Sequence, residues 1–232
     1  ENSHLQDLIF AFFSQTEEID QDMFNRLYPY ISQLIFMSMD INKMYRYLTM
    51  VLSLANNGIN IENIDVIINN IIDSKEDFMV EIILFLIQYS KNPQNFFDYI
   101  IFNFENKFYN DSIIKASIRA FNYCWMKFSI EQKNQIAQII SSSIAQMPYS
   151  LRFICVSFIC NVESWNIFND IIFFDEIFNF ISQKDISMRC LDAIYQLLSF
   201  DIQNSELNMQ KINILLSHYE DLNDIAFSSD EP

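Results

Sequence analysis

Hydrophobic residues recur every three or four positions along most of the chain, the spacing that gathers them on one face of an α-helix. Four stretches show this pattern: residues 61–72, 96–108, 136–147 and 173–181. Each is followed by a short polar break and a second stretch that is more uniformly hydrophobic. The second stretches, with one more near the start of the chain, cover about 41–55, 76–90, 111–128, 150–161 and 185–199. The pattern predicts pairs of helices throughout.

The polar breaks predict where the second helix of each pair begins. They fall at residues 39–40, 73–75, 110–111, 147–150 and 183–185, and they carry Ser, Asp or Asn. Side-chain oxygens of these residues accept hydrogen bonds from the unpaired N–H groups in the first turn of a helix. We therefore expect the breaks to cap the second helices.

The helix pairs form a repeat, because the second stretches begin 35 to 39 residues apart. One pair cannot cover its own hydrophobic faces, whereas stacking of successive pairs buries them. The sequence therefore predicts an all-α fold, a right-handed α-solenoid of about five stacked helical hairpins. We expect a single repeat domain over residues 1–227 and an acidic tail at 228–232. The repeats cover about 23–56, 60–91, 94–128, 130–162 and 170–200, between capping helices at 3–14 and 206–219.

The second stretch of the fifth pair carries a resemblance to a known family. It begins at Asp185, has a base at Arg189 and a small residue four positions later, and continues with aliphatic side chains. This order resembles the second helix of HEAT repeats and is similar to the third helix of armadillo repeats. Parts of it recur at 40–46 and 111–116, and the resemblance covers about 23–200. It implies an interaction surface on a rigid stack, with the second helices along the concave face.

Composition excludes several classes of enzyme. Gly58 is the single glycine of the chain, and glycine-rich phosphate loops and nucleophile elbows need several glycines. The two histidines, His4 and His218, stand at opposite ends, so a helical enzyme would need a site near His218 and the acids of 220–224. The four cysteines contain no Cys-x-x-Cys pair, and we expect them to be buried and reduced in a cytoplasmic or nuclear protein.

Charge narrows the choice of partner. The chain has 14 basic and 30 acidic residues, and the two ends, 1–22 and 201–232, carry most of the net charge of −16. A nucleic-acid partner is excluded, since binding to a phosphate backbone needs clustered Lys and Arg. The longest hydrophobic run, 82–87, is too short to span a bilayer, so we expect no membrane insertion.

Basic residues on the second helices are the main candidates for function. Arg46, Lys115, Arg152 and Arg189 occupy matching places in their repeats, and Arg119 follows Lys115 by one turn. They could line a groove that receives an acidic or phosphorylated segment. Alternatively, each could pair with the Asp cap of a neighbouring repeat and form a structural ladder. We favour the ladder, which the resemblance to HEAT repeats implies.

Tyrosines add candidate anchors for a partner. Tyr28, Tyr30, Tyr45 and Tyr47 cluster in the first repeat, and exposed aromatic side chains are common anchors at protein interfaces. We predict that Tyr45 and Tyr47 belong to the partner-binding surface.

The sequence thus predicts a non-enzymatic scaffold or adaptor that binds a protein or peptide partner and has no cofactor. A permanent helical subunit of a larger complex, and a helical enzyme near His218, are the alternatives.

Overall fold

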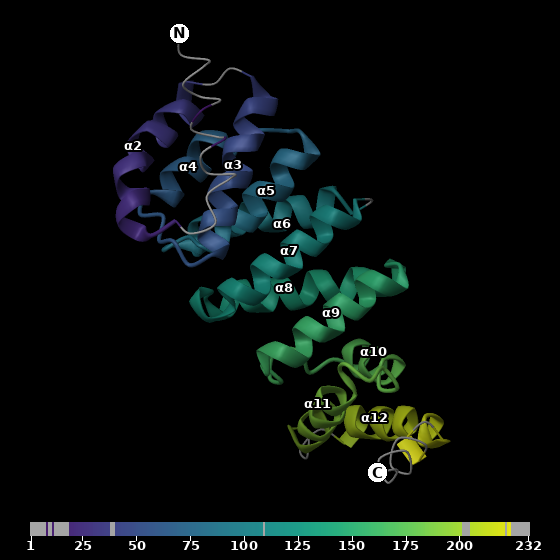
Figure 1. Ribbon diagram of the computed structural model, residues 1–232. Helices are drawn as coiled ribbons and strands as arrows, with labels where there is room; N and C mark the ends of the chain where they lie inside the picture. The colour runs from purple at the N-terminus through teal and green to yellow at the C-terminus, as the bar shows by residue number, and fades with distance from the viewer. Residues whose placement is uncertain are drawn as a thin grey trace. The chain divides into compact units, whose positions relative to one another are not determined.

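The computed structural model describes residues 8, 11, 19–37, 40–108, 110–200, 205–220 and 222–223. Over these residues the chain forms eleven α-helices and three short 3₁₀-helices, and no strand (Figure 1). The prediction of an all-α fold is confirmed for this part of the chain.

Contacts between residues divide the chain into two compact units, unit 1 up to Ala120 and unit 2 from Phe121 onward. The boundary falls inside one helix, α7 (Asp111–Cys124). We expected one repeat domain over residues 1–227, and nothing in the composition near residue 120 indicated a division.

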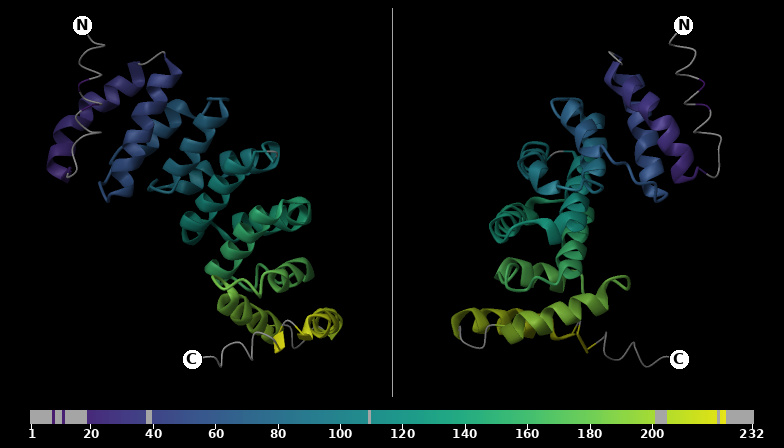
Figure 2. Two further views of the ribbon diagram at one scale, coloured as in Figure 1. Left: turned by 45° about the vertical axis from the view of Figure 1, so that its right-hand side comes forward. Right: turned by 90° about the vertical axis from the view of Figure 1, so that its left-hand side faces the viewer.

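Unit 1 is built from helix pairs. Its elements are α2 (Gln21–Met37), α3 (Ile41–Asn56), α4 (Ile64–Ile71), α5 (Asp77–Ile87), η1 (Pro93–Phe96), α6 (Phe97–Asn106) and the first part of α7. Within it, α2 packs on α3 and α4 packs on α5, and α3 also packs on α5 (Figures 1 and 2). The second helix α3 therefore contacts both its own partner, α2, and the second helix of the next pair, α5.

Unit 2 repeats this arrangement. Besides the end of α7 it contains η2 (Trp125–Lys127), α8 (Ile130–Ser143), η3 (Ile144–Gln146), α9 (Tyr149–Val162), α10 (Ile171–Asn179), α11 (Ser187–Phe200) and α12 (Ser205–Ser217). Here α10 packs on α11, α9 packs on α11, and α10 packs on α12. Contacts thus run within a pair and between equivalent helices of neighbouring pairs.

The predicted positions of the helices are confirmed over the described residues. The five second helices, α3, α5, α7, α9 and α11, begin within two residues of the predicted starts. The predicted capping helix at 206–219 corresponds to α12. The predicted helix at 3–14 falls largely outside the described residues, of which residues 8 and 11 are helical, and the tail at 228–232 lies outside them.

Polar side chains cap two of the second helices at the predicted breaks, α3 and α7. The prediction is wrong for α5 and α9, which begin after Glu76 and Pro148 without a side-chain cap. The carboxylate of Asp40 accepts a hydrogen bond from the N–H of Asn42 at 2.9 Å, which starts α3. The side-chain oxygen of Asn110 accepts one from the N–H of Ser112 at 3.1 Å, at the start of α7. Because these oxygens replace the missing helical acceptors, the breaks at Asp40 and Asn110 fix the first turns of α3 and α7.

The second helices are buried where their hydrophobic residues run together. In α5, seven of the eleven residues are buried: Met79, Val80, Ile82, Ile83, Leu84, Leu86 and Ile87. In unit 2, Trp125 stacks on Phe168 at 5.5 Å between ring centroids and meets Phe158 edge-on at 5.5 Å. The indole N–H of Trp125 donates to the hydroxyl of Ser164 at 2.8 Å, which satisfies the polar atom of this aromatic core.

Lys211 attaches α12 to unit 2 through an amino group inside the protein. Its side chain is fully buried, and its Nζ donates a hydrogen bond to the carbonyl oxygen of Leu197 at 3.0 Å and another to the side-chain oxygen of Asn169. The same Nζ lies 5.6 Å from the ring centroid of Phe174, within the range of a cation–π interaction. One side chain on α12 therefore contacts α10, α11 and the loop before α10.

Gly58 ends α3 in a left-handed conformation, with φ of 86°. We expect Gly58→Ala to lower the free energy of unfolding by about 1 kcal/mol, because an L side chain is strained at this φ. A Cβ added here meets nothing within 4 Å, so a steric clash would not contribute. Urea denaturation measures the change. Glu163→Gly is the matched control, since Glu163 also has a positive φ, 49°, and should gain stability; no difference between the two variants would contradict the prediction.

Candidate interaction surface

The exposed side of the second helices in unit 1 joins aromatic rings to basic groups. Tyr45 on α3 meets Phe78 on α5 edge-on, with ring centroids 5.1 Å apart. Two turns further along α5, the ring of Phe85 lies 5.4 Å from the guanidinium carbon of Arg119 on α7. These two contacts link three successive second helices through side chains that remain partly exposed.

Two further cations stand beside these rings. Arg46 follows Tyr45 on α3, and Lys115 lies one turn before Arg119 on α7; both side chains are exposed. Within the part of the chain that the structure describes, neither forms an ion pair. We call Tyr45, Arg46, Phe78, Phe85, Lys115 and Arg119 the second-helix surface of unit 1.

The prediction that Tyr47 offers an exposed ring is wrong. Its side chain is 4% exposed and belongs to the core of unit 1, whereas Tyr45 is 37% exposed. Residues two apart on a helix point about 200° apart, so a helix that exposes Tyr45 turns Tyr47 inward. Tyr47 therefore stabilises the fold and has no place on the second-helix surface.

In unit 2 the corresponding base is partly buried and paired with a buried carboxylate. The guanidinium of Arg152 on α9 donates from Nε to Glu176 Oε2 at 2.9 Å and from Nη2 to Glu176 Oε1 at 2.8 Å. Glu176 lies on α10 and is buried. Burial raises the pKa of the Glu176 carboxyl, and this effect outweighs the opposite influence of Arg152. Arg152 is thus a structural cation between neighbouring helix pairs.

Other polar contacts between neighbouring pairs involve partners that the sequence did not indicate. Arg189 on α11 donates a hydrogen bond to the side-chain oxygen of Asn161 on α9. In unit 1, the Nζ of Lys107 contacts the carboxylate of Asp77 at 2.7 Å, and Asn110 donates to the same carboxylate at 2.9 Å. These two hydrogen bonds hold the pKa of the Asp77 carboxyl below its usual value.

The bases of unit 2 form contacts of the kind that the ladder predicts, whereas the binding groove stays a prediction. Arg152 and Arg189 link neighbouring helix pairs, as the ladder predicts, but the ladder's partners are wrong: they are Glu176 and Asn161 in place of Asp caps. The cap Asp40 uses its carboxylate on the backbone N–H groups of its own helix. Cross-helix contacts of this kind depend on how helices pack, which periodicity alone does not reveal.

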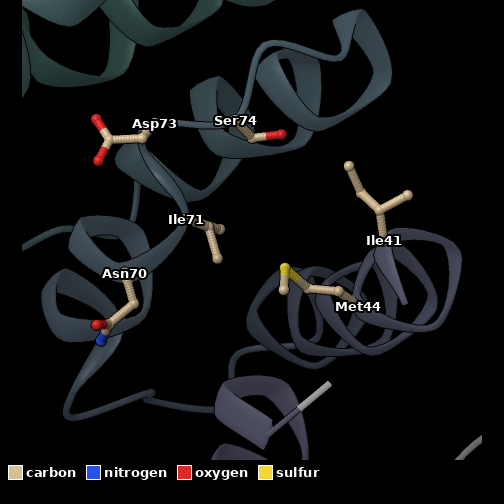
Figure 3. A pocket seen from close by; sticks show the side chains of 6 residues that line it. All are labelled: Ile41, Met44, Asn70, Ile71, Asp73 and Ser74. Atoms are coloured by element: carbon tan, nitrogen blue, oxygen red, sulfur yellow. The ribbon is translucent and has the colours of Figure 1, made fainter. Parts of the chain in front are cut away.

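A small pocket lies where α3 begins and α4 ends (Figure 3). It has a volume of about 240 Å³, and the residues that line it are Ile41, Met44, Asn70, Ile71, Asp73 and Ser74. The side chains of Ile41, Met44 and Ile71 surround the space, whereas the carboxylate of Asp73 points away from it (Figure 3). Pockets that hold small molecules are larger, about 300–1,000 Å³, and combine such walls with convergent polar groups.

The side chains that could carry chemistry are embedded in hydrophobic surroundings. The ring of His218 stacks on Phe178, with centroids 5.1 Å apart. Burial raises the pKa of the Cys124 and Cys155 thiols to about 12, and a hydrogen bond with Cys190 together with burial raises that of Cys160. Such thiols stay protonated near neutral pH and are poor nucleophiles.

The described residues hold neither a cluster of metal ligands nor a membrane-spanning helix. They contain no group of three or more side chains that could hold a metal ion; Asp221 and Asp224, predicted near His218, lie outside them. None of the helices that the structure describes is long and hydrophobic enough to cross a bilayer.

Comparison with known proteins gives no match to this chain. No family model matches it, and no curated protein and no solved structure matches it significantly. The resemblance to HEAT and armadillo repeats therefore stays a prediction from the residues that carry it.

Proposed function

We propose that the protein is a non-enzymatic interaction scaffold built from stacked helical hairpins of the HEAT or armadillo type. Contacts within each unit support this architecture: equivalent helices of neighbouring pairs pack together, as in α3 with α5, α9 with α11 and α10 with α12. This is the contact pattern of a solenoid, in which each repeat touches its neighbours. The buried, protonated thiols fit a protein of the cytoplasm.

The second-helix surface of unit 1 is the binding site in this proposal, and its partner is an acidic or phosphorylated segment of another protein. The observation that carries the proposal is the alternation of cations and partly exposed rings across α3, α5 and α7, with Arg46 and Lys115 exposed. Arginine binds carboxylates and phosphates through paired hydrogen bonds, and neighbouring aromatic rings supply contact area that excludes water.

An array of acidic and phosphoserine-containing peptides tests the proposal. We expect the wild-type chain to bind a subset, and the double variant Arg46→Glu/Lys115→Glu to bind that subset at least tenfold more weakly, since each charged hydrogen bond contributes roughly 1.5–3 kcal/mol. Fluorescence anisotropy on the selected peptides gives the affinities. Both side chains are exposed, so the thermal unfolding midpoint should change little.

The matched control is Lys91→Glu/Lys184→Glu, which changes the net charge equally at two exposed bases outside the second-helix surface. Equal weakening in both double variants would show that net charge alone attracts the peptides. Failure of the wild-type chain to bind any peptide of the array would reject the proposed partner class.

A further inference from the structure

The last described helix carries an exposed hydrophobic stripe. Met209, Ile212, Leu216 and Tyr219 are 60%, 42%, 62% and 62% exposed. Their spacing of three, four and three residues is that of the a and d positions in a heptad repeat, which meet a partner helix along a narrow seam. The helix continues beyond Ser217, because the N–H of Leu222 donates to the carbonyl of His218 at 3.1 Å. We call these four residues the α12 stripe.

Another face of α12 is already occupied within unit 2. Lys211 is buried there, His218 stacks on Phe178, and the helix packs on α10. Residues 211 and 218 are seven apart, so they define one face, and the α12 stripe lies on the other. The helix therefore packs on unit 2 through one face and exposes its hydrophobic stripe on another.

Acidic residues border the α12 stripe. Glu206 lies three residues before Met209, and Glu220 lies four residues after Leu216, so both are surface neighbours of the stripe; both are exposed. Lys211 is the single basic residue between positions 201 and 232, and its side chain is buried. One edge of the stripe is consequently negative, and the described residues of α12 include no exposed base.

The negative charge beside the α12 stripe favours one kind of partner over the others. Glu206 and Glu220 both lie at position e of the heptad, so an antiparallel second copy of α12 would place glutamate against glutamate. A parallel second copy would offer them no cation, because Lys211 is the single basic residue of this part of the chain and is buried. An anionic lipid surface would be repelled in the same way. A helix with Lys or Arg beside its own hydrophobic stripe would pack its hydrophobic residues along the α12 stripe. It would also pair its basic side chains with the glutamates beside the stripe.

We propose that the α12 stripe binds an amphipathic helix of another protein, with hydrophobic residues at heptad spacing and basic residues alongside them. This site is separate from the second-helix surface and does not depend on the function proposed for it. A long-lived helix-to-helix contact at α12 would suit a permanent subunit of a complex.

The test uses the full chain and a designed probe. The probe is a fluorescent peptide of about three heptads with Leu at positions a and d and Lys at e and g. The control probe has the same composition in a shuffled order that destroys the heptad. We expect the heptad probe to bind and the shuffled probe to bind at least tenfold more weakly, with affinity falling as salt is added.

Two variants locate the site. Leu216→Asp should weaken binding of the heptad probe at least tenfold, whereas Tyr195→Asp, at an equally exposed residue of α11, should leave it unchanged. Circular dichroism verifies that both variants are folded. Equal binding of the two probes, or equal weakening by the two variants, would overturn the proposal.

The same chain and probes distinguish two other possible occupants of the α12 stripe. If sedimentation shows that the wild-type chain dimerises and that Leu216→Asp abolishes the dimer, the stripe binds a second copy. If the heptad probe binds only after residues 224–232 are deleted, the end of this chain occupies the stripe. Either result would overturn the proposed partner.

Discussion

Arg152→Met is expected to lower the free energy of unfolding by about 3 kcal/mol at pH 7, because it leaves the buried carboxylate of Glu176 without its cation. Glu176 is 7% exposed, so water cannot replace the guanidinium. The hydrocarbon part of Met fills most of the space that the Arg side chain occupies, which separates loss of charge from loss of packing. Urea denaturation, monitored by circular dichroism, measures the change.

The pH dependence of this variant identifies the cause. Glu176 has a pKa raised above the ordinary value of 4.5 in the folded protein, so it stabilises the fold in its protonated form. That contribution is present below pH 4.5 and is lost as the pH rises through the folded pKa. Removing Arg152 raises the folded pKa further. Arg152→Met should therefore be closer to wild type in stability at pH 4 than at pH 7.

The double variant Arg152→Met/Glu176→Met is the control for packing. Replacing both partners of a buried ion pair by hydrophobic residues removes the unpaired charge, so we expect most of the lost stability to return. A single variant as unstable at pH 4 as at pH 7, or a double variant less stable than the single one, would contradict this account of the Arg152–Glu176 pair.

Lys211→Ala is expected to release α12 from unit 2 and to cost about 3 kcal/mol, in the range for truncating a long, fully buried side chain. Its Nζ holds the carbonyl of Leu197, and its stem fills space between the helices. Hydrogen exchange of the α12 amides, measured by mass spectrometry, should increase strongly. The exchange of α9 should change much less, since Lys211 makes its contacts through α10, α11 and the preceding loop.

Two variants of the same helix complete this experiment. Lys211→Met keeps the stem but leaves the carbonyl of Leu197 without this donor, so it should cost less, about 1–2 kcal/mol. Gln210→Ala changes the exposed neighbouring residue and should stay within about 0.5 kcal/mol of wild type. Unchanged protection of α12 in Lys211→Ala would show that other contacts hold this helix.

The sequence predicted the helices well, because their signals are local. Asp40 and Asn110 mark where α3 and α7 begin, and the hydrophobic spacing marks where each helix faces the core. The inward orientation of Tyr47 was also readable, since it shares a stripe with Val51 and Leu54 at helical spacing. Its cluster with other tyrosines concealed that stripe.

The partners of the charged residues were not predictable in the same way. Arg152 and Glu176 are 24 residues apart and lie on different helices, so their meeting depends on how α9 packs on α10. The rings of Phe78 and Phe85 were missed as neighbours of Tyr45 and Arg119 for the same reason. The sequence alone does not distinguish an exposed base such as Arg46 from a paired base such as Arg152.

The distribution of cysteines has a consequence for following the protein's motions. All four, Cys124, Cys155, Cys160 and Cys190, lie in unit 2 and are buried, and unit 1 has none. An alkylating reagent can reach these sulfurs only when the helices around them separate. The rate of alkylation therefore measures how often unit 2 opens, whereas the opening of unit 1 produces no signal. Half of the chain thus carries its own chemical reporter without any added label.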